Sequence, residues 1–325
     1  MRNKIIICIL LIAILGASSN YQQLSGSVKE LIFGTSSSQN SMSPQAKMKL
    51  WITADYGAHT VWVGEVKIAP GQNLLTLMKK HLQVGTGYGG GFVKTINSYP
   101  AHSSIAESRD WFLYIDGILS DKGAGEVVPA SGQVIWWDFH SWDGTTFVPA
   151  AIGAYPAPLC GDLMTAVPGN KDYLETLREL SRTIQHKSEV SRSSIALSDK
   201  WTPELYSFPV IIVGEWPQLC KTPAIAALFD RSTEGGIFCD FKDGALQAYD
   251  EQGRLVRTFG AGSGCIVSTG SGLGDTSPVW IISGTDRQGV NRVIELLRVH
   301  PEQLARKFGL VVSGSEVMAL PARAE

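Results

Sequence analysis

The chain has no run of basic residues and almost no net charge. Its 325 residues include 28 Lys and Arg against 30 Asp and Glu, which gives a formal net charge of −2. Proteins that bind nucleic acid use a basic patch to pair with phosphates, so the sequence argues against a nucleic-acid partner. With 44% hydrophobic and 18% charged residues, the composition is that of a folded protein, and the length favours two domains.

The chain also lacks the spacings that mark common catalytic and metal sites. No His stands in H-E-x-x-H, no Ser stands in G-x-S-x-G, and no two Cys stand in C-x-x-C. We therefore predict a protein that is not an enzyme and requires neither metal nor cofactor. The alternative is an enzyme that uses single carboxylates near predicted strand ends, at Glu215, Asp275 or Asp286; capping and turn roles are the ordinary use of such residues.

Cysteines are few, and four of the five follow the N-terminal segment, at Cys160, Cys220, Cys239 and Cys265. In an exported chain they could form disulfides. Cys239 and Cys265 both lie in predicted strands, so a bridge between them and a pair of buried thiols fit the sequence equally well.

The amino terminus carries a targeting signal. Arg2 and Lys4 precede an apolar run from Ile5 to Leu15, and small residues follow it. This order is typical of a secretory signal peptide, with an uncleaved membrane anchor as the alternative. We predict a targeting segment over residues 1–19, a polar linker over 20–46, and an extracytoplasmic protein that is secreted or tethered to the membrane.

The first predicted domain, residues 47–144, combines strands with one helix. The segments 48–56 and 60–68 are rich in β-branched and aromatic residues and predict a hairpin. An amphipathic helix is predicted over 73–84, with Asn73 as its cap. Further strands are predicted over 92–96, 111–116 and 133–139, and the segment 124–129 reads as a strand or a loop. One helix over a mixed sheet favours a β-grasp-like arrangement within an α+β protein.

A change of composition over 145–158 marks the predicted boundary to an α/β domain over residues 155–325. Helices are predicted over 171–190, 222–231 and 287–300, with a short closing helix over 301–309. Strands are predicted over 209–216, 236–241, 245–249, 255–259, 265–268 and 278–284.

The stretch 84-VGTGYGGGFV-93 has the glycine spacing of a dinucleotide-binding loop. In that motif a helix follows the loop and its amino terminus holds the phosphates. Here a predicted helix precedes the loop and a predicted strand follows it, so a nucleotide is not expected. Gly85 fits the left-handed position after a helix, and the later glycines permit a sharp turn or the close approach of a partner. A second glycine-rich stretch, 260–278, reads as either a functional surface loop or a long structural connection.

Several segments together resemble a known family. The segments 88-YGGGFVKTINSYP-100, 111-WFLYIDGILSDKGAGEVVP-129 and 132-GQVIWWDFHSW-142 are similar to the carboxy-terminal domain of transcobalamin and intrinsic factor, and to exported bacterial proteins that share the pattern. The resemblance covers about residues 48–142. It implies a β-grasp-like module that, in the vitamin carriers, closes over one face of cobalamin with backbone and apolar contacts. The helical barrel that forms the carriers' other half has no counterpart in this chain.

The resemblance implies a small-molecule ligand, with cobalamin or another corrinoid as the candidate, and a membrane transporter or surface protein as a further partner. The ligand-binding residues would be Tyr88, Gly89, Gly90, Gly91, Phe92, Trp111 and Trp137. The aromatic cluster Trp136, Trp137, Phe139, His140 and Trp142 alternates along a predicted strand, so only about half of it can share one face. The alternative function is a cell-surface structural or adhesion module without a small-molecule ligand.

Overall fold

The computed structural model describes residues 45–101, 108–143, 147–160, 163–166, 171–187, 195–198, 208–230 and 234–323. The predicted targeting segment and nearly all of the predicted linker lie outside the described residues. Ala46–Glu325 form one compact unit. Within the described ranges, no helix is both long enough and apolar enough to span a membrane.

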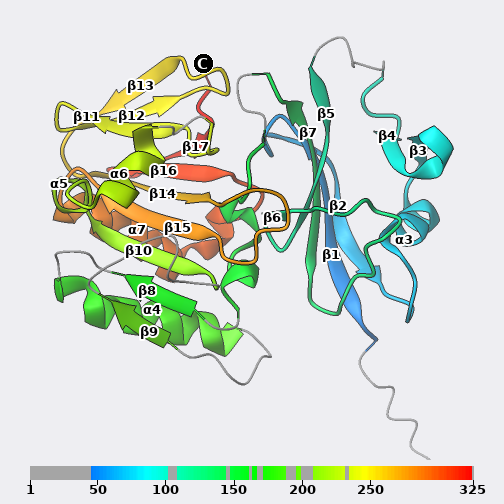
Figure 1. Ribbon diagram of the computed structural model, residues 1–325, viewed down its shortest axis with the longest axis horizontal. Coiled ribbons are helices and arrows are strands. Elements are labelled where there is room, and N and C mark those ends of the chain that lie inside the picture. Colours follow the sequence, from blue (N-terminus) through cyan, green and yellow to red (C-terminus); the bar gives the residue numbers. More distant parts are fainter. Residues whose placement is uncertain are drawn as a thin grey trace, which may run out of the picture. The chain divides into compact units, whose positions relative to one another are not determined.

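The first sheet has a β-grasp arrangement (Figure 1). Its strands are β1 (Lys47–Ala54), β2 (His59–Lys67), β5 (Arg109–Ile115), β6 (Ile118–Leu119) and β7 (Val134–Ser141), in the spatial order β2-β1-β7-β5-β6. The central pair, β1 and β7, is parallel, whereas β1 with β2 and β5 with β7 are antiparallel. Helix α3 (Leu74–His81) buries Leu74, Leu77 and Met78 against this sheet. The predicted hairpin, the α+β class and the β-grasp-like first part are confirmed.

The start of α3 ties the helix to a distant loop. The Asn73 side chain accepts a hydrogen bond from the Thr76 N–H at 2.9 Å, as predicted for the cap. The N–H groups of Leu74 and Leu75 donate to the carbonyls of Val127 and Ala124 at 2.7 and 3.0 Å. The segment 124–129 is therefore a loop rather than a strand, and it satisfies helix N–H groups that would otherwise lack partners.

The glycine-rich stretch is a hairpin rather than a loop between a helix and a strand. Helix α3 ends at His81, three residues before the predicted end, and β3 (Val84–Gly87) then pairs with β4 (Phe92–Ile96) around a 3₁₀ turn over Tyr88–Gly90. A strand rather than a helix follows the turn, so no helix amino terminus is placed there to hold a phosphate.

The predicted left-handed role of Gly85 is wrong, because Gly85 lies in β3 opposite Thr95. A Cβ atom at Gly85 would collide with the Thr95 side chain, so close approach across the hairpin requires glycine there. The left-handed residues are Tyr88, with φ of 50°, and Gly90, with φ of 103°.

A mixed seven-stranded sheet forms the second part. Its strands are β8 (Leu163–Ala166), β9 (Ile195–Ser198), β10 (Val210–Glu215), β14 (Ser263–Thr269), β15 (Val279–Gly284), β16 (Gly309–Ser313) and β17 (Glu316–Leu320), in the order β17-β16-β14-β15-β10-β8-β9. The strands β15, β10, β8 and β9 run parallel to one another, and β14, β16 and β17 add antiparallel pairs.

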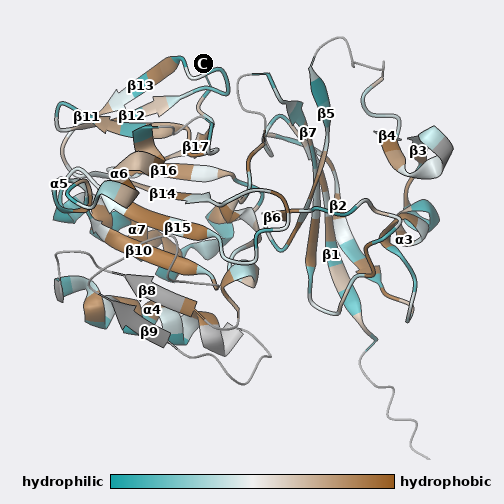
Figure 2. Cartoon of the chain, viewed as in Figure 1, coloured by the Kyte–Doolittle hydropathy of each residue, from teal (hydrophilic) through white to brown (hydrophobic). Residues whose placement is uncertain are grey.

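Different elements pack on the two faces of this sheet (Figure 1). The central strands β10 and β15 are mainly hydrophobic (Figure 2). Helices α4 (Leu174–Lys187) and α7 (Arg287–Val299) cover one face. The other face packs against α5 (Trp216–Leu219), α6 (Pro223–Asp230) and a small sheet of β11 (Cys239–Lys242), β12 (Ala245–Tyr249) and β13 (Leu255–Phe259). Because side chains alternate along a strand, Ile211 faces the first cover and Ile212 the second.

Four strands of this sheet had no counterpart in the sequence prediction: β8, β9, β16 and β17. The predicted closing helix over 301–309 is only a 3₁₀ turn, Pro301–Leu304, and the chain then enters β16. The reason is packing: Leu310 and Val312 fill the α7 side of the sheet while Val311 fills the other. A strand buried on both faces is continuously apolar and lacks the alternation that marks a half-buried strand.

The two parts share a hydrophobic core. Trp51, Tyr56 and Trp136 of the first sheet lie in one buried cluster with Phe238 and Phe308 of the second part. The predicted domains 47–144 and 155–325 are therefore in extensive apolar contact, and the division of the chain into these two domains stays a prediction.

Candidate ligand-binding cleft

A cleft of about 200 Å³ brings together four of the seven predicted ligand-binding residues. Gly91 and Phe92 come from the glycine-rich hairpin, Trp111 from β5 and Trp137 from β7. These residues are separated by up to about fifty positions in the sequence and meet because β5 and β7 are neighbours in the sheet. Their role as ligand contacts stays a prediction.

The other three predicted residues, Tyr88, Gly89 and Gly90, form the turn outside the cleft lining. Tyr88 is 83% exposed, and its ring meets Phe92 edge to face with 5.8 Å between centroids. The Lys94 ammonium lies 5.6 Å from the centre of the Tyr88 ring. An exposed aromatic ring beside a cleft offers a stacking surface for a planar group.

Strand β7 separates the cleft from the shared core. Trp137 and Phe139 face α3 and the cleft side, whereas Trp136 lies in the core shared with the second part. The predicted division of the aromatic cluster between two faces is confirmed. Both faces of β7 are buried, so the strand's position is fixed from two sides.

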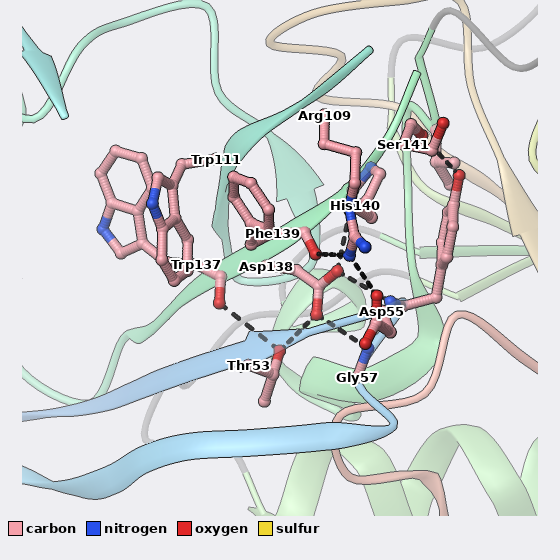
Figure 3. A network of polar contacts seen from close by, with 12 residues as sticks. Thr53, Asp55, Gly57, Arg109, Trp111, Trp137, Asp138, Phe139, His140 and Ser141 are labelled. Carbon is pink, nitrogen blue, oxygen red and sulfur yellow. Dashed lines mark hydrogen bonds and ion pairs between the residues drawn. The ribbon is translucent and has the colours of Figure 1, made fainter. Parts of the chain in front are cut away.

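A fully buried carboxylate fixes β7 to the turn after β1 (Figure 3). One oxygen of Asp138 accepts from the Tyr56 N–H at 2.9 Å and lies 2.8 Å from the His140 Nδ1. The other accepts from the Thr53 hydroxyl at 2.5 Å and from the Gly57 N–H at 2.7 Å. Four hydrogen bonds offset the cost of burying the charge. No motif in the sequence identified Asp138, which reads there as a single polar residue in an apolar strand.

The segment from Leu119 to Ala124 forms a further wall. The Ser120 hydroxyl donates to the Lys122 carbonyl at 2.9 Å and accepts from the Lys122 N–H at 3.1 Å, which closes a tight local turn. Ala124 in turn accepts from α3. This wall is held by the same helix that packs behind Trp137.

Leu273 completes the lining, and it comes from the second glycine-rich stretch. The Gly274 N–H donates to the Leu119 carbonyl at 2.7 Å, which joins this loop to the wall from the first part. The two glycine-rich stretches therefore meet at one cleft. Sequence reasoning singled out both but carried no signal that they meet, because nothing local encodes a contact over more than 150 positions.

Two indole N–H groups lie at the cleft. The Trp111 indole N–H donates to the Lys94 carbonyl at 3.3 Å, whereas the buried Trp137 indole N–H has no hydrogen-bond partner. Lys122 is the one charged residue among the described residues that line the cleft.

Replacing Trp111 with phenylalanine is expected to destabilise the protein by about 1 kcal/mol more than replacing Trp137. Both side chains are at least nine-tenths buried and lose the same atoms. Only the Trp111 substitution breaks a hydrogen bond and leaves the Lys94 carbonyl without its donor. Urea unfolding of the two full-length variants, followed by far-UV circular dichroism, measures the difference. Equal losses would contradict the assigned roles of the two indole groups.

Two carboxylates of the alternative enzyme site, Asp275 and Asp286, accept hydrogen bonds from backbone N–H groups. Asp275 accepts from the N–H groups of Ser271 and Ser277 at 2.7 and 2.8 Å, and Asp286 caps α7 through the Gly289 N–H at 2.9 Å. Partial burial opposes ionisation of Asp275, but these hydrogen bonds outweigh it and hold its pKa below the usual value.

Glu215, at the end of β10, accepts from the Tyr173 hydroxyl at 3.2 Å and lies 3.6 Å from the Arg287 guanidinium. Burial, with the Glu215 charge next in effect, raises the pKa of Tyr173 above its usual range. No group of three or more His, Cys, Asp or Glu side chains gathers at a point that could hold a metal in the part of the chain that the structure describes.

No disulfide joins the cysteines of the described residues. Cys239 and Cys265 are both fully buried in the core shared by the two parts. Burial, with a hydrogen bond to the Cys265 thiol next in effect, raises the pKa of the Cys239 thiol well above its usual range, so Cys239 is present as a protonated thiol.

Comparison with known proteins finds a family model that matches part of the chain. Residues 71–141 match the family described as Domain of unknown function (DUF4430). The matched segment runs from just before α3 to the end of β7, so it includes Phe92, Trp111 and Trp137 but not Leu273. No curated protein matches the chain.

Among solved structures, haptocorrin in complex with Cbi is similar at 17% sequence identity and a TM-score of 0.24. The match covers 30% of this chain and 26% of that chain. This chain therefore spans about a quarter of haptocorrin, and a likeness of this size carries no argument about function.

Proposed function

We propose that the protein is an exported, non-enzymatic protein that binds a small ligand at the cleft between the glycine-rich hairpin and the Trp-bearing strands. The supporting observation is that Phe92, Trp111 and Trp137, chosen from sequence alone, line one cleft. Ligand sites in proteins are concave and mainly apolar, with few polar groups, and this cleft has that character. An uptake role with a membrane transporter or surface protein as partner belongs to the same proposal.

A corrinoid is the candidate ligand that the resemblance to the vitamin carriers suggests. The cleft, at about 200 Å³, is below the usual size of pockets that enclose a drug-sized ligand. A corrinoid would therefore lie across the rim, with its flat face on Tyr88 and an edge group in the cleft. The exposed Tyr88 ring and the glycine backbone beside it leave room for such a contact.

Titration of the full-length protein with cyanocobalamin, followed by its visible spectrum and by equilibrium dialysis, tests the corrinoid version. We expect saturable binding that Tyr88→Ala weakens by about tenfold, because loss of a stacked aromatic ring costs on the order of 1–1.5 kcal/mol. Phe147→Ala, which removes an aromatic ring that is 43% exposed outside the cleft lining, is the matched control and should leave binding unchanged.

Absence of saturable binding would remove corrinoids as ligands. Self-association or binding to wall polymer by a protein that binds no small molecule would instead favour a surface structural or adhesion module.

A further inference from the structure

We infer that the cleft takes a small apolar ring that carries an anionic group, with Leu273 against the ring and Lys122 beside the anion. The inference rests on the proposed function, since it takes the cleft to be the ligand site, but it assigns a chemical class that does not depend on a corrinoid. It also assigns a contact from outside the segment that matches the family, because Leu273 lies beyond residues 71–141.

The ring follows from the shape and lining of the cleft. Phe92, Trp111, Trp137 and Leu273 present apolar surface around about 200 Å³, and a cavity of roughly 150 Å³ is enough to hold benzene. Two indole rings favour a flat apolar group over a branched one.

The position of Leu273 is built into the fold. Asp275 shapes its loop by accepting from the Ser271 and Ser277 N–H groups, and Gly274 fastens the loop to the Leu119 carbonyl. Leu273 is 51% exposed. A ligand ring in the cleft would cover that exposed surface.

The charged residue in the cleft lining favours an anionic group on the ligand. Lys122 is exposed and lines the cleft. The side chain of the neighbouring Asp121 lies against Gly274, with its Cγ 2.8 Å from where a Cβ atom of Gly274 would be, and Asp121 is not among the residues that line the cleft. The Ser120 hydroxyl is engaged in its own turn. Lys122 is therefore the charged side chain that the lining offers to a ligand, and a carboxylate or sulfonate complements it.

Two probes that differ only in charge test this class: 2-naphthoate and its neutral amide, 2-naphthamide. Affinities for the full-length protein are measured by equilibrium dialysis and by ligand-detected saturation-transfer NMR. We expect naphthoate to bind about two- to fivefold more tightly than the amide, as for a solvent-exposed ion pair, and the preference should shrink in high salt.

One variant at Lys122 and one at Leu273 test whether these residues contact the anion and the ring. Lys122→Ala should abolish the preference for naphthoate, whereas Lys67→Ala, at an exposed lysine of β2, should keep it. Leu273→Ser should weaken both probes by about three- to tenfold, because part of a leucine side chain no longer covers the ring. Leu255→Ser is the matched control, since Leu255 is 53% exposed on β13 outside the cleft lining, and should change neither affinity. All four replace exposed or half-exposed side chains, so unchanged far-UV circular dichroism is expected.

The inference is overturned if neither probe binds, if naphthoate and the amide bind equally, if the preference survives Lys122→Ala, or if Leu273→Ser leaves both affinities unchanged. Binding of naphthoate with the expected variant effects but no binding of cyanocobalamin would support the inference and remove the corrinoid version of the proposed function. Binding of cyanocobalamin without binding of either probe would do the reverse.

Discussion

Replacing Phe308 with alanine is expected to lower the free energy of unfolding by about 3–5 kcal/mol. Phe308 is fully buried just before β16, and its ring lies 4.8 Å from Trp136, 5.2 Å from Tyr56 and 5.4 Å from Tyr114, between centroids. Those three aromatic residues belong to the first sheet and its turns. The substitution therefore opens a void between the two parts, where the aromatic surroundings can relax only partly.

Urea unfolding of the full-length protein, followed by far-UV circular dichroism, measures the loss. Phe308→Leu keeps part of the ring's volume and should cost less, about 1–2 kcal/mol. Phe147→Ala removes a half-exposed ring and should stay within about 0.5 kcal/mol of wild type. A loss of less than about 1 kcal/mol for Phe308→Ala would mean that contact between the two parts adds little to stability.

The contribution of Phe308 could not be predicted from the sequence. The stretch that contains it reads as the end of a helix, and its true neighbours stand between about 170 and 250 positions earlier in the chain. The same limit applies to β16, which is apolar on both faces and has no alternation to identify it. Local periodicity does predict the first hairpin, α3 with its Asn73 cap, and the strands that carry Trp111 and Trp137, because each depends on residues close in sequence.

In the glycine-rich hairpin, local sequence patterns predict the turn but assign the wrong role to Gly85. Glycines at 85 and 87 suggested a loop after a helix, but Gly85 is needed inside a strand, where the Thr95 side chain crosses its face. A glycine that permits left-handed φ and a glycine that permits close approach look alike in a sequence. The sequence predicted the cleft residues that lie in the first sheet and the glycine-rich hairpin. It did not predict Leu273, which comes from the second part.

Replacing Asp138 with alanine is expected to cost about 3–5 kcal/mol, because four hydrogen-bonding groups that face its buried carboxylate lose their partner. Two of these groups are the backbone N–H groups of Tyr56 and Gly57, which donate to this carboxylate. The Thr53 hydroxyl also accepts from the Trp136 indole N–H at 2.6 Å, so the loss extends to an aromatic residue of the shared core. The expected result is loss of order in the turn after β1 together with a weaker contact between the parts.

Asparagine at position 138 is the sharper test, because it keeps the shape of the side chain. Each Asp138 oxygen accepts from one backbone N–H, that of Tyr56 or that of Gly57. Either orientation of an asparagine amide therefore places its NH₂ against a backbone N–H, and we expect a loss of about 1–3 kcal/mol from the unmet donor. Urea unfolding measures this loss, with the exposed Asp143→Asn as a control that should stay within about 0.5 kcal/mol of wild type.

Because Trp137 adjoins Asp138 on β7, the asparagine variant should also weaken naphthoate binding at the cleft, in proportion to the disorder it introduces in that strand. A variant as stable as wild type would show that the four hydrogen bonds do not hold β7 to its turn. A variant that is destabilised yet binds naphthoate as wild type would show that the cleft keeps its geometry independently of the network behind it.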